Sequence, residues 1–97
     1  MKILAIDKHL PGATPEKIKL LLKHEVLHSW GLQKQDVIRE LYFRTDKAGV
    51  VLMLECQNIE EAQKILTEFP LVKAGLIEFE CMSLGYFKPF ELLFPNQ

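Results

Sequence analysis

Apolar residues fall along the chain in six blocks whose spacing predicts six secondary-structure elements. Four blocks are short runs rich in β-forming residues and predict strands at 2–6, 37–45, 50–55 and 76–84. The other two blocks have apolar residues every three or four positions and predict amphipathic helices at 15–30 and 59–69. The order of elements is therefore β-α-β-β-α-β.

Residues that favour helix ends support the boundaries of both predicted helices. Thr14 can cap the first helix and Pro15 suits its first turn, and we expect this helix to end at Gly31. Asn58 can cap the second helix, which Pro70 then ends. The first helix should present a single apolar face, formed by Ile18, Leu21, Leu22, Val26 and Trp30.

This order of elements is that of the ferredoxin-like split βαβ arrangement. The fold class is therefore α+β, with two right-handed crossovers that place both helices on one face of a four-stranded antiparallel sheet. We expect the strand order 4-1-3-2.

The second face of this sheet is predicted to be covered by another copy of the chain. Residues 3–6 and 50–54 are apolar on both sides of their strands, whereas a sheet face open to water should be polar. Residues 87–97 add more aromatic side chains than a free terminus usually exposes. We therefore expect a ferredoxin-like domain at 1–86, an apolar C-terminal tail at 87–97 that lies at a dimer interface, and a homodimer that forms an α/β barrel.

Composition narrows the classes of function. The chain has 97 residues, a formal net charge of -1 and 48% hydrophobic residues, which is typical of one globular domain. A near-neutral balance of charge argues against nucleic-acid binding, and the short apolar runs argue against a membrane span or a signal peptide. Cys56 and Cys81 form no C-x-x-C motif, and we expect two reduced thiols and a cytoplasmic protein.

The last third of the chain resembles the muconolactone delta-isomerase-like proteins of the dimeric α/β-barrel superfamily. The resemblance depends on Phe69-Pro70-Leu71, on Ile77-Glu78-Phe79-Glu80 and on Ser83-Leu84 before an aromatic tail, with support from residues 39–44. It implies the fold and a homodimeric barrel. Lys88-Pro89 stands where those isomerases have a His-Pro, and no catalytic residue is carried over from the family.

The string His24-Glu25-Val26-Leu27-His28 matches the zinc hydrolase motif H-E-x-x-H on a predicted helix. Two histidines four residues apart share one helical face and can hold Zn²⁺ while the glutamate activates water. Position 34, where the longer form of the motif has a third histidine, is Lys34. We therefore keep a zinc hydrolase as a remote alternative and expect no metal site. Otherwise His24 and His28 lie on the flank of the helix, as candidates for ligand binding.

A second set of candidate residues combines carboxylates with an aromatic and a basic residue. Glu78 and Glu80 alternate along the last strand, and Glu40, Tyr42 and Arg44 alternate along the second. A carboxylate in an enclosed barrel would have a raised pKa and could transfer a proton, and Arg or Tyr could hold an enolate. The alternative is that these residues form ion pairs across a dimer interface.

These observations predict a protein that binds a small organic molecule between the sheet and the helices. As an enzyme it would be a cofactor-free isomerase that acts by proton transfer on a lactone-like or oxygenated ring compound. The alternative of a non-catalytic ligand-binding or assembly module stays open, because fold alone does not decide function. His9 follows the first predicted strand and is a further candidate for ligand binding.

Overall fold

The computed structural model describes residues 1–95 and shows an antiparallel sheet with helices on one face. Its strands are β1 (Lys2–His9), β2 (Ile38–Phe43), β3 (Val50–Glu55) and β4 (Ile77–Leu84), and its helices are α1 (Pro15–Lys34), α2 (Ile59–Thr67), α3 (Pro70–Lys73) and the 3₁₀ helix η1 (Lys88–Leu93). The strand order is β2-β3-β1-β4. The ferredoxin-like α+β fold and the predicted strand order are confirmed.

The strand register separates the two faces of the sheet. Ile3 and Ala5 of β1 are opposite Leu54 and Leu52 of β3, and all four side chains are buried against the helices. These residues form the main core together with Ile38, Cys56, Ala62, Leu66 and Phe69. The alternate residues lie on the other face, which we call the open face; it includes Leu4, Ile6, Val51, Met53 and Met82. The prediction that residues 3–6 and 50–54 of the two central strands are apolar on both faces is therefore confirmed, whereas the edge strands add the charged residues Glu40, Glu78 and Glu80 to the open face.

Strand β1 is longer than the sequence predicts. The prediction ended it at Ile6 because Asp7, Lys8 and His9 are polar. In the structure these three residues pair with Phe79, Glu78 and Ile77 of β4. Pairing with a long neighbouring strand keeps the backbone extended whatever the polarity of the side chains. Asp7 and His9 consequently project from the sheet on the side of the helices.

Helix α1 is also longer than predicted. It continues through Gly31 to Lys34 and is followed by Asp36, whose φ of 62° turns the chain into β2. Gly31 alone costs the helix about 1 kcal/mol relative to alanine. The extra turn places Leu32 against the main core, and the carbonyl of Leu32 accepts a hydrogen bond from the Val37 amide at 3.0 Å. Tertiary packing therefore outweighs the local preference for a helix end.

Helix α3 was not predicted, although Pro70 was expected to end the helix before it. Proline has no amide hydrogen and suits the first turn of a helix as well as the end of one. Here α2 ends at Thr67 and Pro70 begins the short helix α3. Helix α3 positions Leu71, which packs with Leu76 and Ile77 in a small cluster beside α1.

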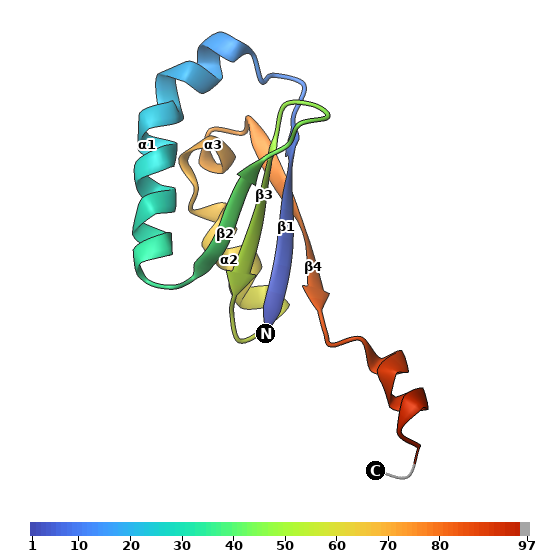
Figure 1. Cartoon of the computed structure of the whole chain (residues 1–97). Helices are drawn as coiled ribbons and strands as arrows, with labels where there is room; N and C mark the ends of the chain where they lie inside the picture. Colours follow the sequence, from blue (N-terminus) through green and yellow to red (C-terminus); the bar gives the residue numbers. More distant parts are fainter. Residues whose placement is uncertain (96–97) are drawn as a thin grey trace.

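The C-terminal segment leaves the end of β4 and extends away from the sheet and its helices (Figure 1). It contains η1, and the structure has a longest dimension of 58 Å against 29 and 21 Å in the other directions. Asn96 and Gln97, the last two residues of the predicted tail, lie outside the described residues. Of the helices in the described part of the chain, none has the length and apolar character needed to cross a bilayer.

Candidate functional site: a pocket between α1 and the sheet

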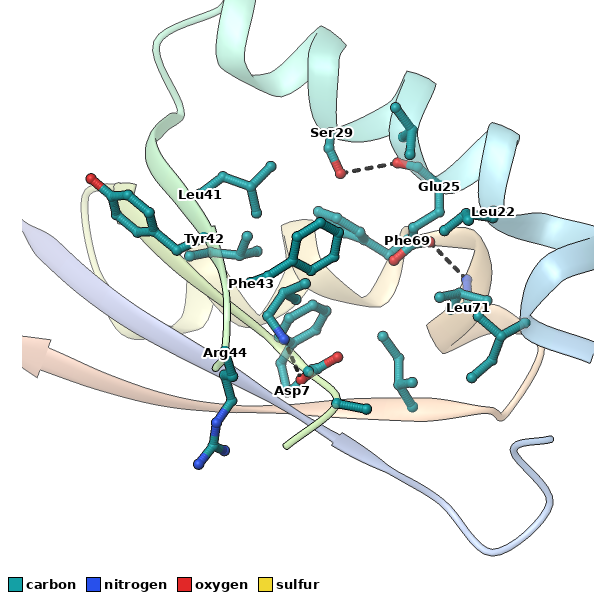
Figure 2. A pocket seen from close by; sticks show the side chains of 18 of the residues that line it. Asp7, Leu22, Glu25, Ser29, Leu41, Tyr42, Phe43, Arg44, Phe69 and Leu71 are labelled. Carbon is teal, nitrogen blue, oxygen red and sulfur yellow. Dashed lines mark hydrogen bonds between the residues drawn. The ribbon is translucent and has the colours of Figure 1, made fainter. Parts of the chain in front are cut away.

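A cavity of about 650 Å³ lies between α1 and the helix-facing side of the sheet. Its volume is within the range typical of small-molecule sites, roughly 300–1,000 Å³. Most of its lining is apolar, and the polar side chains that reach it are Asp7, His9, Glu25, Ser29, Gln33, Tyr42 and Arg44. Figure 2 shows Glu25 and Ser29 on α1, above Phe69, and Asp7 on the opposite side of the space.

The predicted apolar face of α1 forms a wall of this pocket rather than part of a packed core. No residue of α1 is buried, and Leu22, Val26 and Trp30 are between 47% and 59% exposed. All three line the cavity. The middle of the predicted apolar face therefore faces the sheet across the cavity and does not pack closely onto it. The apolar residues of α1 that pack on the core clusters are Ile18 and Leu21 near its start and Leu32 near its end, and the cavity lies between these contacts.

A register shift in β2 directs its apolar side chains into the pocket. Ile38 is opposite Leu54 and Glu40 is opposite Met53, so that Arg39 is an extra residue in the ladder. Beyond this bulge, Leu41 and Phe43 point to the side of the helices and line the cavity (Figure 2). An extended run without the bulge would have turned them to the opposite face.

Glu25 supplies a carboxylate to the pocket from the middle of α1. Its Oε1 accepts a hydrogen bond from the Leu71 amide at 3.0 Å. Pro70 has no amide hydrogen, so this is the first backbone donor of α3, and Glu25 satisfies it from another helix. Burial raises the pKa of Glu25; the Leu71 hydrogen bond opposes this increase, and the negative charge of Asp7 adds to it. A raised pKa lets a glutamate carry a proton nearer to neutral pH.

Asp7 supplies a second carboxylate, from β1. Its side chain is only 6% exposed, and its Oδ1 accepts a hydrogen bond from the Val50 amide at 2.8 Å. Gly49 makes room for this contact: a Cβ on Gly49 would lie 2.7 Å from Asp7 Oδ1, and its φ of 154° is one that side-chain-bearing residues rarely adopt. His9 Nε2 lies 3.9 Å from Asp7 Oδ2, beyond hydrogen-bond distance.

The structure separates the carboxylates and tyrosine predicted from sequence. Strands β2 and β4 form opposite edges of the sheet, so Glu40 and Tyr42 do not meet Glu78 and Glu80 within one chain. The register places these four residues on the open face, away from the pocket floor. Tyr42 reaches the rim of the cavity, but its ring points away from the interior (Figure 2). Its hydroxyl donates to Glu40 Oε2 at 3.0 Å, which raises the pKa of Tyr42.

Arg44 lies at the edge of the pocket. Its guanidinium pairs with Asp46 at 2.6 and 2.9 Å, and this pairing raises the pKa of Arg44 and lowers that of Asp46. Arg44 therefore has an acidic partner in the same turn of the chain. Within one chain this partner is Asp46 rather than either predicted glutamate of β4.

The two histidines of the H-E-x-x-H string have different surroundings. His24 is exposed, whereas His28 packs edge-to-face on Phe69 with 4.7 Å between ring centres, and its Nε2 is buried. Glu25 between them is engaged with α3. Among residues 1–95, no three His, Cys, Asp or Glu side chains gather closely enough to hold a metal ion. Neither histidine lines the cavity, whereas His9 does.

Sequence reasoning assigned neither Asp7 nor Glu25 to a small-molecule site. The sequence pattern indicates that a strand ends at Asp7 and that Glu25 is the water-activating residue of a zinc motif. One available signal was a carboxylate in the middle of an amphipathic helix, three or four residues from Leu21, Leu22 and Ser29. That spacing places Glu25 on the side of the helix that faces the sheet.

No protein-family model matches the chain, and no curated protein matches it by sequence. A solved structure is similar in three dimensions: 5-chloro-2-hydroxyhydroquinone dehydrochlorinase from Burkholderia phenoliruptrix AC1100, in complex with 2,5-dihydroxybenzoquinone. The TM-score is 0.65 at 19% sequence identity, over 92% of this chain and 98% of the other. At this level of identity the likeness concerns the backbone, and the chain therefore shares the ferredoxin-like fold of that protein over nearly its whole length.

Proposed function

We propose that the protein binds a small oxygenated ring compound in the pocket between α1 and the sheet and transfers a proton on it. The observation that carries this proposal is the Glu25 carboxyl group, whose pKa is raised by burial in a mainly apolar cavity that a second carboxylate also reaches. A carboxyl group that exchanges its proton nearer to neutral pH suits general acid–base catalysis.

The two carboxylates provide the two halves of an isomerisation. The carboxylate of Asp7 would accept a proton from an acidic carbon of the ring, and the protonated Glu25 would give one to another atom of the same ring. The substrate gains and loses one proton, so no oxidant or reductant is consumed, and Asp7 would then lose a proton to water while Glu25 regains one from it. Apolar walls from Leu41, Phe43 and Phe69 would hold the ring and exclude water.

The similar structure supports a ring-shaped ligand. That protein was solved in complex with 2,5-dihydroxybenzoquinone, a six-membered ring with oxygen substituents, and it has the same fold as this chain. The resemblance of residues 69–84 to muconolactone delta-isomerase-like proteins supports the same class of ligand, since a lactone is also an oxygenated ring. Both likenesses agree with the apolar lining and few polar groups of this cavity.

One observation favours a non-catalytic ligand-binding module instead. Glu25 and Asp7 each accept a hydrogen bond from a backbone amide, of Leu71 and Val50 respectively. Carboxylates used in this way stabilise the positions of α3 and of the turn before β3. In such a module they would shape the pocket without transferring a proton.

We infer further that two copies associate through the open face. Leu4, Ile6, Val51 and Met53 lie there side by side across β1 and β3, and Met82 extends the apolar surface onto β4. A second sheet packed at about 10 Å would bury them. Glu78 and Glu80 would then face the interior of the barrel. The free thiols Cys56 and Cys81 fit a reducing compartment such as the cytoplasm.

The test uses 2,5-dihydroxybenzoquinone as the probe, with binding measured by calorimetry. Exchange of its ring hydrogens for solvent deuterium is then followed by proton magnetic resonance. We expect binding, exchange that is faster than in buffer, and a loss of about 100-fold or more of that acceleration in Glu25→Gln. The matched control is Glu80→Gln, on the open face, which should leave the exchange rate unchanged.

The other outcomes separate the alternatives. Binding without any acceleration of exchange would support the non-catalytic module. A loss of exchange in Glu80→Gln but not in Glu25→Gln would move the chemistry to the open face. No binding of the probe at millimolar concentration would show that this class of oxygenated ring is wrong.

A further inference from the structure

The pocket lining includes exposed large apolar side chains from α1 and from the edge strand β2. We call the exposed rim that they form the mouth; it consists of Leu22, Val26 and Trp30 of α1 and of Leu41 and Phe43 of β2. Trp30 is 57% exposed and Phe43 is 85% exposed. Contiguous apolar side chains at this exposure are uncommon on a monomer and usually mark a binding surface.

The tail presents a second exposed apolar surface. Phe87, Phe90 and Phe94 are 59–62% exposed, and Leu92 is 81% exposed. From the usual area of an aromatic side chain, the three phenylalanines alone expose on the order of 300–400 Å², which compares with the largest apolar patch of a typical monomer. In Figure 1 the tail extends away from the chain's own sheet and helices.

Residues 87–95, the described part of the tail, have local structure of their own. Residues Lys88–Leu93 form a 3₁₀ helix, and the rings of Phe87 and Phe90 pack edge-to-face with 5.0 Å between centres. The Tyr86 hydroxyl donates a hydrogen bond to Glu91, which gives that carboxylate a local partner. A preformed segment loses less conformational freedom when it docks, which favours its use as a docking element.

The edges of the sheet indicate where the tail of a second copy would lie. Strands β2 and β4 are the two edges, and each has one side free of pairing within the described residues. Free edges are usually paired or covered, and placing β4 of one copy beside β2 of another closes both into a barrel. Helix α1 contacts β2, and the tail directly follows β4. In such a barrel the tail of the second copy would begin beside β2, the strand that forms the mouth together with α1.

We propose that the aromatic tail of a second copy of this chain lies across the mouth of the pocket, so that each site is complete only between two chains. This inference uses the pocket and the dimer of the proposed function and adds the partner's tail as a wall of the site. Tail aromatic rings would cover Trp30 and Phe43 and exclude water from the space around Glu25. Assembly and site formation would then be linked, because one segment serves both.

Trp30 provides a test that needs no ligand, since it is the only tryptophan of the chain. We compare its emission wavelength and its quenching by acrylamide in the full chain and in the double variant Phe90→Ser/Phe94→Ser. The proposal predicts blue-shifted, poorly quenched emission in the full chain, and a red shift with severalfold stronger quenching in the variant. The matched control is Leu20→Ser, which removes an apolar residue that is 80% exposed on α1 but lies outside the pocket lining.

Sedimentation of the same samples decides between the explanations. A variant that stays dimeric with Trp30 as protected as in the full chain overturns the proposal. The same is true of a full chain that is dimeric but has Trp30 fully open to acrylamide, because the tail would then lie elsewhere, such as on the open face. A dimeric variant with an exposed Trp30 supports the proposal directly.

A cross-linking measurement gives a second answer if the variant dissociates. In chains with Cys56 and Cys81 replaced by alanine, Val26→Cys at the mouth and Lys88→Cys in the tail are made in separate chains, which are mixed and refolded together. A short bismaleimide should join one of each, whereas Leu20→Cys with Lys88→Cys should give no product. If dimers form but the Val26→Cys and Lys88→Cys chains are not joined, the proposal is overturned. Calorimetry with 2,5-dihydroxybenzoquinone then tests the pocket separately, because ligand binding can fail while the cross-link forms.

Discussion

Helices α1 and α2 occupy equivalent places in the two halves of the fold but cover the sheet differently. Helix α2 has nine residues and buries Ala62 and Leu66 in the main core. Helix α1 has twenty residues and buries none. Both carry an apolar stripe with helical spacing. The comparison shows that such a stripe identifies the side that faces the protein, but not whether the space behind it is filled.

The structure gives a physical reason for the difference. Near its start α1 packs through Ile18 and Leu21 on the cluster that contains Leu71 and Ile77, and near its end it packs through Leu32 on the main core. Between these contacts Glu25 accepts a hydrogen bond from the Leu71 amide, and His28 packs edge-to-face on Phe69. The helix is therefore supported along its length while a cavity stays open beneath its middle turns.

The largest expected contrast is between a core residue of α2 and a pocket residue of α1. Leu66→Ala removes a side chain that is 3% exposed and should lower the free energy of unfolding by about 2–5 kcal/mol. Val26→Ala, at 59% exposure, should lower it by less than about 1 kcal/mol. Urea denaturation of both variants measures the difference. Equal losses would show that α1 packs on a filled core.

A second contrast concerns the glycine beneath the pocket. Gly49→Ala places a Cβ against Asp7 Oδ1 at a positive φ and should cost about 1–3 kcal/mol. The control is Gly12→Ala, where nothing lies within 4 Å of the added Cβ and φ is ordinary, and it should be neutral or slightly stabilising. Thermal unfolding compares the two. A harmless Gly49→Ala would mean that Asp7 does not hold this turn.

The helix caps provide a smaller effect that tests how firmly each helix is anchored. Asn58 accepts the Glu61 amide at 2.8 Å and Thr14 accepts the Lys17 amide at 3.3 Å. Replacing either residue by alanine should cost about 1 kcal/mol. Only Thr14→Ala should also weaken binding of 2,5-dihydroxybenzoquinone, because α1 is a wall of the pocket. Calorimetry on both variants checks this, and equal affinities would show that the start of α1 does not shape the site.

The smallest effect is the pH dependence that Glu25 adds to stability. Its pKa is raised in the folded state, so the folded protein holds this proton more tightly than the unfolded chain. Stability from this group is complete below the unfolded pKa and is lost as pH rises through the folded pKa. Glu25→Gln should therefore raise the melting temperature more at pH 7 than at pH 4.

The control for this prediction is Glu61→Gln, which changes a partly exposed carboxylate of α2 that accepts a hydrogen bond from the Gln57 amide. Unlike Glu25→Gln, this variant should not raise the melting temperature more at pH 7 than at pH 4. If Glu25→Gln lowers the melting temperature at pH 7 more than at pH 4, the charged form of Glu25 is stabilising and the acid role proposed for it is wrong.

Local patterns were enough to predict the architecture. The four apolar strands, the caps Thr14 and Asn58 and the order of elements determine the α+β fold and the strand order, because strand pairing and right-handed crossovers leave few alternatives. The apolar open face could also be read from residues 3–6 and 50–54, since a side-chain period of two assigns each residue to a face. These features depend on neighbours in sequence or on simple rules of connection.

The candidate site depended on contacts that no local pattern contains. Asp7 lines the pocket because its pairing with β4 extends β1 beyond the predicted end of the strand. Phe43 lines it because the bulge at Arg39 turns the following side chains of β2 to the opposite face of the sheet. Whether Val26 and Trp30 closed onto the sheet depended on the distance at which α3 and Leu32 hold α1. Sequence determines which side chains are apolar and in what order they occur, whereas the separation between two packed elements, and hence a pocket, is set only when all their contacts form together.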